Sequence, residues 1–517
     1  MKFFKEIKHD LPSSVIVFFV ALPLCLGIAL ASGAPLFSGL IAGIVGGIVV
    51  GSISGSSLGV SGPAAGLAVI VLSSIQELGS FEAFLLAVVF AGIIQLILGL
   101  LKAGFVGYFF PSSVIKGMLS GIGFIIILKQ IPHAFGYDSG YEMDMKFKHA
   151  DSGNTLSEIV KMLDYISLPV IVVSATSLFI ILFWDNYLSK KAKFFSIVQG
   201  PIVAVAFGII YEYLCLNYFP SCAITREHLV NVPVAGDFNS FLSQFSFPDF
   251  SLIGNYNVYV IAFTLAVVAS LETLLSVEAT DKLDPIKRVT PTNRELIAQG
   301  AGNVISGLIG GLPITQVIVR SSANIQSGAK TKLSGIIHGF LLLISVIVIP
   351  QLINYIPLGV LASILFVVGF KLAKPSLFKH MYQLGYKQFV PFIITILGIV
   401  FTDLLSGIAI GLAVSIFFIV RDNYKNSHFM HIKEKNNTTH LVEMTLSEEV
   451  SFLNKGAILK ELNRLPFNSE IVIDLTDSIK VDYDVYEIIE NFRKNAAPEK
   501  NIKVVVKSNT KYSTVDY

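Results

Sequence analysis

Two interrupted stretches give the main indication of the fold. The first reads Leu58-Gly59-Val60-Ser61-Gly62-Pro63-Ala64-Ala65-Gly66, and the second reads Gly310-Gly311-Leu312-Pro313-Ile314-Thr315-Gln316. Both place glycine and proline immediately before a short apolar segment. Proline suits the first turn of a helix, and glycine permits a sharp approach of the backbone. Each stretch therefore predicts a half-helix whose N-terminus begins abruptly after a break in the chain.

The sequence around these two breaks is typical of a membrane protein. Of its 517 residues, 53% are hydrophobic and 14% are charged, and 28 of the 74 charged residues lie after position 421. A membrane-spanning helix needs about 20 apolar residues. About fourteen segments are predicted to cross a membrane: 13–31, 36–54, 62–77, 81–101, 112–130, 166–184, 196–216, 255–278, 295–311, 316–327, 332–350, 357–371, 387–403 and 405–421.

The two broken segments are the third and the tenth of these fourteen, so they correspond if the segments form two sets of seven. Paired interruptions at corresponding positions are the best sequence indication of a transporter's substrate site. A helix N-terminus presents unpaired N–H groups and about half a positive charge. Two such termini facing each other would form a pocket for a small anion. The alternative is that glycine and proline are simply common in membrane helices.

Two charged residues lie at membrane depth near these breaks. Arg320 follows the second break, and Glu272 lies in the eighth segment with Ser276 four residues later on the same helix face. A buried charge is costly unless it faces water or a partner, which makes Arg320 a candidate anion ligand. Its alternative role is to pair with a carboxylate and lock two helices. Glu272 must take up a proton, bind a cation or pair with Arg320, so it is a candidate for coupling.

Several other classes of function are excluded by the sequence. It has no zinc-protease, Walker or nucleophile-elbow motif, and its nine histidines lack metal-ligand spacing, so no catalytic or resident metal site is predicted. A net charge of +2 is too small for a nucleic-acid footprint, and three cysteines cannot form a secreted disulfide scaffold. Without an ATP-binding motif, transport would be passive or driven by an ion gradient.

The distribution of lysine and arginine predicts that both chain ends are cytoplasmic, because such residues gather in cytoplasmic loops. The opposite side receives mainly Lys146, Lys148, Lys161 and Arg226, which lie in the two longest loops. The predicted cytoplasmic set is Lys2, Lys5, Lys8, Lys102, Lys190, Lys191, Lys193, Lys282, Lys287, Arg288, Arg294, Lys330, Lys332, Lys371, Lys374, Lys379, Lys387, Arg421 and Lys425.

The chain resembles the sulfate permease (SulP) family of inorganic anion transporters along nearly its whole length. Five runs carry the resemblance: Ala21-Leu22-Pro23, Ser61-Gly62-Pro63, the stretch from Phe110 to Gly123, the stretch from Ala298 to Asn303, and Asn324-Ile325-Gln326-Ser327-Gly328-Ala329-Lys330-Thr331-Lys332-Leu333-Ser334-Gly335. Their order and spacing make the resemblance specific. It implies seven plus seven inverted repeats, a core domain that moves against a gate domain, and homodimers.

The resemblance also implies roles for individual residues. An anion would lie between the starts of the third and tenth helices, in contact with Pro63, Ala64, Ala65, Gln316, Val317 and Ile318, and Arg320 matches an arginine near the anion in many relatives. Glu272 takes the place of a carboxylate that serves proton or sodium coupling, with Ser276 beside a sodium site of cyanobacterial bicarbonate transporters. Many relatives have glutamine after the first-span proline. This chain has Leu24 at that position, and the cyanobacterial bicarbonate transporters also have an apolar residue there. The absence of the glutamine weakens a sulfate assignment.

The last part of the chain changes pattern. From about residue 440, short apolar strands alternate with amphipathic helices, which predicts a small α/β domain. It resembles the STAS domain that follows the membrane part in this family. The loop Val481-Asp482-Tyr483-Asp484 lacks the serine that related anti-sigma-factor antagonists phosphorylate. A dimerisation or interaction module is therefore favoured over a phosphorylation switch or a nucleotide-binding module.

The sequence thus predicts a polytopic α-helical membrane protein with a membrane domain at 1–421, a linker at 422–439 and a STAS-like domain at 440–517. Its predicted function is secondary transport of a small inorganic anion, bicarbonate first, across the cell (inner) membrane, coupled to Na⁺ or H⁺ through Glu272. Sulfate or dicarboxylate transport is the alternative within the family, and a passive anion channel is the alternative in another class. The arginine and the family motifs argue against a nucleobase carrier, and the broken helices argue against a plain membrane anchor. Membrane lipid and a second copy of the chain are its expected partners.

Overall fold

The computed structural model describes residues 6–104, 111–137, 166–191, 195, 198–234, 244–402, 404–425, 428–436 and 439–508. The chain divides into two compact units. The membrane unit comprises residues 1–385 and 392–410, and the C-terminal unit comprises 386–391 and 411–517. Several residues that the sequence analysis used lie outside the described residues: Lys2, Lys5, Phe110, Lys146, Lys148, Lys161 and Lys193.

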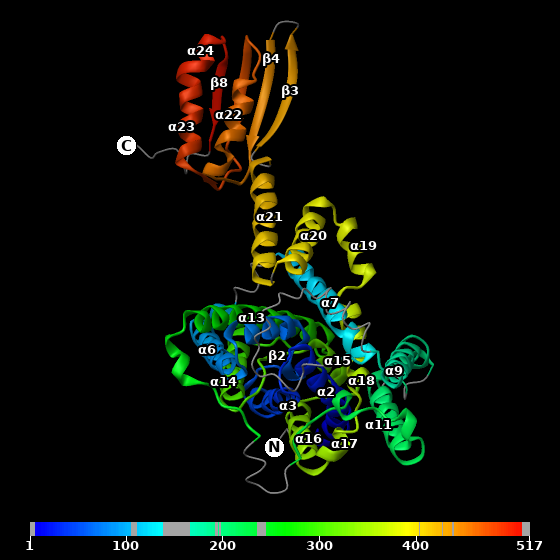
Figure 1. Ribbon diagram of the computed structural model, residues 1–517. Helices are drawn as coiled ribbons and strands as arrows, with labels where there is room; N and C mark the ends of the chain where they lie inside the picture. Colours follow the sequence, from blue (N-terminus) through cyan, green and yellow to red (C-terminus); the bar gives the residue numbers. More distant parts are fainter. Residues whose placement is uncertain are drawn as a thin grey trace. The chain divides into compact units, whose positions relative to one another are not determined.

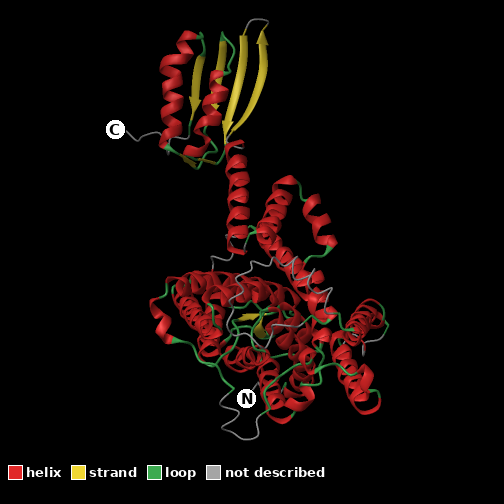
Figure 2. Ribbon diagram, viewed as in Figure 1, coloured by secondary structure: helices red, strands yellow, loops and turns green. Residues whose placement is uncertain are grey.

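Helices make up most of the described residues as far as residue 425 (Figures 1 and 2). They are α2 (Ile7–Ala31), α3 (Leu36–Val45), η1 (Gly46–Val50), α4 (Gly51–Ile53), η2 (Ala65–Leu67), α5 (Ala68–Leu78), α6 (Phe81–Leu100), α7 (Ser112–Phe135), α9 (Leu168–Asn186), α11 (Gly200–Tyr218), α13 (Tyr256–Leu283), α14 (Thr292–Leu308), α15 (Ile318–Gln326), α16 (Leu333–Val348), α17 (Pro350–Ile353), α18 (Leu358–Leu372), α19 (Pro375–Gln383), α20 (Tyr386–Phe401) and α21 (Leu404–Lys425). Short helical turns are η5 (Leu188–Lys190), η6 (Pro220–Cys222), η7 (Arg226–His228) and η8 (Phe250–Gly254).

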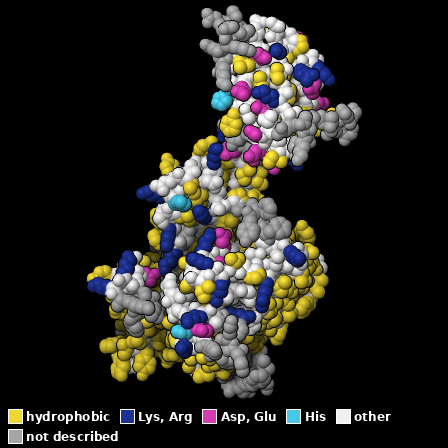
Figure 3. Space-filling model, turned by 180° about the vertical axis from the view of Figure 1, so that it is seen from behind, with side chains coloured by type: hydrophobic (Ala, Val, Ile, Leu, Met, Phe, Trp, Pro, Cys, Tyr) yellow, Lys and Arg dark blue, Asp and Glu magenta, His cyan; other side chains and the backbone are white. Residues whose placement is uncertain are grey.

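Each of the fourteen predicted segments has a helical counterpart in this series. Within the described residues, nine helices are long and apolar enough to cross a membrane, and three shorter apolar helices accompany them. The surface agrees with a lipid environment, because large apolar side chains such as Leu168, Phe179 and Tyr218 are more than 60% exposed. Figure 3 shows broad apolar areas on the membrane unit. The fold is therefore that of a polytopic helical membrane protein, as predicted.

Both predicted half-helices are present, and each follows a short β-strand. Strand β1 (Ser61–Pro63) precedes η2 and α5, and strand β2 (Ile314–Gln316) precedes α15. The two strands pair in antiparallel register, with Ser61 opposite Gln316 and Pro63 opposite Ile314. Because the partners run in opposite directions, the two helices leave the strand pair from opposite ends, and each helix N-terminus points back toward it. The strand pair lies inside the helix bundle in Figure 2.

Glycines in the second predicted segment, 36–54, allow α2, β1 and α16 to pack closely against it. A β-carbon added at Gly39 would lie 2.1 Å from the carbonyl oxygen of Cys25 in α2, and one added at Gly46 would lie 2.5 Å from the carbonyl oxygen of Ser61 in β1. One added at Gly47 would lie 2.6 Å from the Cα of Gly339 in α16. Small residues let membrane helices approach closely, and van der Waals packing then replaces the hydrophobic driving force that lipid cannot supply.

The C-terminal unit contains a four-stranded sheet in the order β3-β4-β6-β8. Strand β3 (His428–Asn436) is antiparallel to β4 (Thr439–Leu446), whereas β6 (Ser469–Asp474) and β8 (Lys503–Lys507) continue the sheet in parallel. The remaining elements are β5 (Glu449–Val450), η9 (Phe452–Asn454), α22 (Lys455–Asn463), β7 (Lys480–Val481), α23 (Tyr483–Asn491), η10 (Phe492–Ala496) and α24 (Ala497–Glu499). A small α/β domain is therefore present, as predicted.

The two compact units divide the chain at residue 410 and not at 421, and the predicted linker contains regular structure. The range 422–439 was predicted to be a linker, but α21 continues into it as far as Lys425, and β3 occupies most of the rest. Strand β3 is an edge strand, and its sequence HFMHIKEKN alternates weakly and is rich in polar residues. Edge strands are commonly polar, because polar side chains discourage pairing with other chains. A linker has the same polar composition, so the sequence alone did not distinguish β3 from a linker.

Candidate functional site

The candidate site lies around the β1–β2 pair, where two helix N-termini meet. No side chain caps the N-terminus of η2, α5 or α15. The N-cap residue of α15 is Val317, whose side chain cannot accept a hydrogen bond. Since the first N–H groups of a helix have no partner within the helix, uncapped termini leave donors and partial positive charge beside the strands.

The residues proposed to contact substrate come together here. Pro63, Ala64 and Gln316 are buried, whereas Ala65, Val317 and Ile318 are half-exposed. Pro63 and Gln316 belong to the strand pair, Ala64 is the N-cap residue of η2, and the half-exposed set lies at the two helix starts. Helix α13, which carries Glu272 and Ser276, packs against η2, β2 and α15. The structure thus brings together residues that are far apart in the sequence. Ser61 and Gln316, which pair across the two strands, are 255 positions apart.

Arg320 is the most unusual residue of the site. Its side chain is completely buried, and within the described part of the chain it makes no ion pair. Nη2 donates a hydrogen bond to the thiol sulfur of Cys25 at 3.4 Å, and Nε and Nη1 have no partner. The alternative in which Arg320 locks two helices through a carboxylate is therefore absent from this arrangement. A buried cation with free donors is a candidate anion ligand, because an anion would supply the missing charge and acceptors.

Glu272 faces the other helix start. A β-carbon added at Gly66 would lie 2.6 Å from its Oε1 atom, so the carboxyl group is packed against the η2 backbone. The second oxygen, Oε2, is buried and lacks a hydrogen-bond partner. An unpaired buried carboxylate oxygen can take a proton or contact a hard cation such as Na⁺. Glu272 thus packs against the backbone of η2, whereas Arg320 extends from α15 to the backbone of β1.

Ser276 lies on a hydroxyl-bearing face of α13 that the sequence analysis recognised only in part. Thr273 Oγ1 accepts a hydrogen bond from the Gln316 backbone N–H at 3.3 Å, and Thr280 Oγ1 accepts one from Gln316 Nε2 at 3.1 Å. Thr280 in turn donates to the Ser276 carbonyl oxygen at 2.6 Å. The spacing 273, 276, 280 places these residues on one helix face. This spacing was the signal in the sequence from which the whole hydroxyl-bearing face could have been predicted. This face fixes Gln316 and leaves its Oε1 without a partner.

Two of the runs that carry the family resemblance, 61–63 and 298–303, explain how the strand pair is held. Gln299 Nε2 donates to Ser61 Oγ at 2.8 Å and to Glu295 Oε1 at 3.0 Å, and Ser54 donates to Glu295 Oε2 at 2.5 Å. Asn303 donates to the Ile314 carbonyl oxygen at 3.1 Å and accepts from the Ile314 N–H at 2.6 Å. These buried polar side chains of α14 satisfy both strands, and such networks fix one arrangement because an unpaired member is costly.

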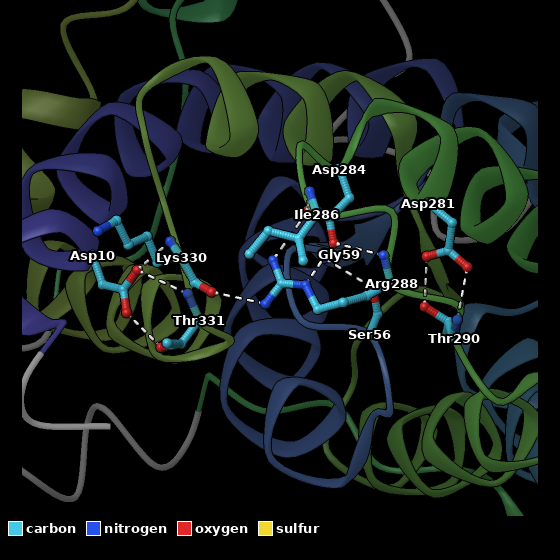
Figure 4. Close-up of polar contacts among 10 residues, drawn as sticks. All are labelled: Asp10, Ser56, Gly59, Asp281, Asp284, Ile286, Arg288, Thr290, Lys330 and Thr331. Carbon is cyan, nitrogen blue, oxygen red and sulfur yellow. Dashed lines mark hydrogen bonds and ion pairs between the residues drawn. The ribbon is translucent and has the colours of Figure 1, made fainter. Parts of the chain in front are cut away.

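The C-terminal end of the second half-helix is held by a separate polar network, shown in Figure 4. The carboxylate of Asp10, at the start of α2, accepts hydrogen bonds from the Lys330 N–H at 2.8 Å, from the Thr331 N–H at 3.1 Å and from the Thr331 hydroxyl. Arg288 bonds the Lys330 carbonyl oxygen at 3.0 Å and the Asp284 carboxylate at 2.6 Å. The Asn324–Gly335 motif therefore anchors α15 to the ends of α2 and α13, while β2 anchors its other end.

Two further residues lie beside Arg320, and the sequence analysis assigned neither of them to the site. Cys25 is buried in α2, and His338 is buried in α16 with Nδ1 bonded to the Gly335 carbonyl oxygen at 2.8 Å and Nε2 without a partner. Both are distant from Arg320 in sequence, and a single Cys or His in an apolar helix carries no periodic signal. Among the residues that the structure describes, no cluster of three or more metal-ligating side chains occurs.

The broken helices, the paired strands and the unpaired buried charges together define a membrane transporter of the half-helix type. The chain belongs to the sulfate permease family, whose sequence model matches residues 7–395. It is therefore an anion transporter of that family and not an enzyme.

Comparisons with individual proteins agree. YvdB of Bacillus subtilis, named for sulfate transport, is 28% identical over 81% of this chain and 74% of its own length. The bicarbonate transporter BicA of Picosynechococcus sp. is 27% identical over 80% of this chain and 70% of its own length. The solved transmembrane domain of a cyanobacterial BicA matches with a TM-score of 0.66 at 26% identity, covering 78% of this chain and 98% of that domain. The murine anion transporter Slc26a9 in its inward-facing state shares the fold, with a TM-score of 0.76 at 14% identity over 97% and 85%.

Proposed function

We propose that this protein is a secondary active transporter of bicarbonate that couples anion movement to Na⁺ or H⁺ through Glu272. The observation that carries the proposal is the buried, unpaired guanidinium of Arg320 beside two uncapped helix N-termini. The anion is proposed to lie against Pro63, Ala64, Ala65, Gln316, Val317 and Ile318, with Arg320 supplying the full positive charge. Ser276 and Glu272 are the proposed groups for the coupling cation.

Charge counting favours a monovalent anion. Two helix N-termini supply about +1 in total, Arg320 adds one, and an ionised Glu272 removes one. The site then carries roughly +1 with Glu272 ionised and roughly +2 with Glu272 protonated or sodium-bound. A monovalent anion can be held in either state, whereas sulfate or a dicarboxylate needs the neutralised carboxylate. Leu24 supports bicarbonate as well, because it is buried and offers no polar group beside Pro23.

Uptake into proteoliposomes tests this proposal. Labelled bicarbonate and labelled sulfate are offered under an inward Na⁺ gradient, under an inward H⁺ gradient and without a gradient. Bicarbonate accumulation above equilibrium under one of the gradients is expected. Sulfate accumulation alone would assign the alternative substrate, and uptake that only equilibrates under every condition would assign a passive anion channel.

The proposed location is the cell (inner) membrane with both termini in the cytoplasm, in a homodimer. The polar network of Figure 4 supports this orientation, because it joins two residues that the charge distribution assigns to the same, cytoplasmic side, Arg288 and Lys330. Labelling of single cysteines added near Lys332 and near Arg226 from either side of sealed vesicles tests the orientation. Cross-linking in the membrane tests the dimer.

Replacing Gly62 with alanine should weaken anion binding. The added β-carbon would lie 2.0 Å from Nη1 of Arg320, so the guanidinium must move away from β1. We expect affinity for bicarbonate to fall by about tenfold or more, comparable to removing a buried charge-assisted contact. Calorimetric titration of the purified variant measures this. The control is Gly254→Ala, where an added β-carbon meets nothing within 4 Å, and equal affinity of the two variants would contradict the placement of Arg320.

Removing the C-terminal domain should leave the anion site intact. Every proposed ligand precedes residue 321, and α21 ends at Lys425. A chain that stops after Lys425 is therefore expected to bind bicarbonate with an affinity within about twofold of the whole protein, since distant sites contribute independently. Loss of binding by a truncated chain that still elutes as a single folded species in detergent would give the C-terminal domain a part in the site.

A further inference from the structure

The partner that Arg320 does have is a thiol. Nη2 donates to the sulfur of Cys25 at 3.4 Å, and both side chains are completely buried. Cys25 lies in α2, two residues after Pro23, so a residue of the first segment contacts a residue of the tenth. A thiol is a weak acceptor and is neutral, in contrast to the carboxylates that usually accompany a buried arginine.

The sulfur is held in place by its surroundings. A β-carbon added at Gly43 in α3 would lie 2.6 Å from Sγ, so only glycine leaves room for the thiol there. On the far side of the guanidinium, the bare Cα of Gly62 leaves room for Nη1. The guanidinium therefore lies between the thiol and the β1 backbone, and its position is determined by two glycines and one sulfur atom.

This arrangement holds the guanidinium without neutralising it. The hydrogen bond to sulfur uses one nitrogen, and Nε and Nη1 remain free of protein partners. The imidazole of His338, which is also close enough to experience the Arg320 charge, leaves an unpartnered nitrogen as well, Nε2. A carboxylate in place of the thiol would form a buried ion pair, and the full positive charge would no longer be available to an anion.

We propose that Cys25 is a positioning residue that orients the Arg320 guanidinium through Nη2 and, by being neutral, preserves its charge for the transported anion. The proposal rests on the proposed role of Arg320 as an anion ligand and extends it to a residue of α2. It identifies position 25 as a determinant of whether the site accepts anions at all. A neutral acceptor there permits binding, and an anionic side chain there replaces the substrate.

Two substitutions of nearly equal size separate charge from shape. Cys25→Asn supplies a neutral acceptor, and Cys25→Asp supplies a carboxylate. We expect Cys25→Asn to keep its affinity for bicarbonate and for sulfate within about threefold, and Cys25→Asp to lose about tenfold or more for both, as expected when a buried charge acquires a competing partner. Calorimetric titration of each anion into the full-length purified protein measures both. Cys215→Asn, at a buried cysteine in α11 outside the site, controls for the loss of a buried thiol.

Thermal unfolding provides a second measurement that does not depend on anion binding. Because the carboxylate would pair with Arg320, Cys25→Asp should unfold at a higher temperature than Cys25→Asn. In an Arg320→Ala background the order should reverse, since the carboxylate is then buried without a partner. A structural role of Cys25 that did not act through Arg320 would give the same order in both backgrounds.

The outcomes are distinguishable. Equal anion affinities for Cys25→Asn and Cys25→Asp overturn the role of Cys25 while the proposed transport function stands. A Cys25→Asp protein that fails to fold, or unfolds below Cys25→Asn, also overturns it, because the predicted pair with Arg320 has not formed. Failure of the unsubstituted protein to bind either anion overturns both proposals.

Discussion

Glu272→Gln is expected to abolish concentrative uptake of bicarbonate while leaving anion binding largely intact. The amide is close to the carboxylate in shape, but it can neither take a proton nor neutralise a cation. Glu272 Oε2 is the buried oxygen without a partner on the η2 side of the site, and no protein cation compensates for it within the described chain. The ratio of internal to external bicarbonate in proteoliposomes should therefore fall to about one, since coupling requires a group that responds to the driving ion.

The matched control is Glu278→Gln, six residues later on the same helix. Glu278 is exposed and pairs with Lys282 at 2.5 Å, so it lies outside the site and its removal should leave accumulation unchanged. Bicarbonate titration of Glu272→Gln should still show binding. Undiminished accumulation by Glu272→Gln would remove this residue from the coupling role and direct attention to other titratable groups near the strand pair.

Arg320→Ala is expected to weaken binding of a divalent anion more than binding of a monovalent one. Coulomb energy scales with the charge of the anion, so losing the guanidinium should cost about 2 kcal/mol for bicarbonate, which is about thirtyfold, and about 4 kcal/mol for sulfate, which is about a thousandfold. Calorimetric titrations of both anions, with and without Na⁺ and at two pH values, measure the two losses and their dependence on the coupling cation.

Arg320→Lys provides the control, because it keeps the charge and loses only the planar fork of donors. It should show a smaller loss and little change in the ratio between the two anions. Equal losses of bicarbonate and sulfate affinity in Arg320→Ala would refute the electrostatic account, even for a protein that transports bicarbonate. Bicarbonate binding in the unsubstituted protein should depend weakly on the cation, and sulfate binding should depend on it strongly.

The helical architecture could be predicted because its signals are local. Apolar length identifies a span, and Gly-Pro interruptions identify a half-helix, so Gly62-Pro63 and Gly311-Leu312-Pro313 were sufficient to indicate both. The amphipathic helix α19, at Pro375–Gln383, was not predicted, since it is too polar to read as a span and lies within a loop rich in lysine. Strand β3 was missed for a related reason, because an edge strand does not need a regular apolar pattern.

The contacts within the site could be predicted only in part. Arg320 and Glu272 are conspicuous as charges in apolar surroundings, whereas the pairing of Ser61 with Gln316 depends on how distant segments pack. Short strands of three residues carry no periodic signal of their own. The contact between Arg320 and Cys25 is of the same kind, since a thiol in an apolar helix looks like any small buried residue until the fold brings a cation to it.

The strand pair also constrains how the protein is made. Residues 61–63 leave the ribosome long before residues 314–316, and until the later strand arrives, the backbone groups of the earlier one have no partner. Hydrocarbon offers them no hydrogen bonds, so a nascent first half would expose costly polar backbone at membrane depth. The first broken helix must therefore wait in water, in the translocation machinery or against a chaperone, and enter the bilayer fully only when its complement has been synthesised. Closure of the strand pair is in this sense a late step of biogenesis, and substitutions that weaken the strand pair should appear as losses in yield before they appear as losses in transport.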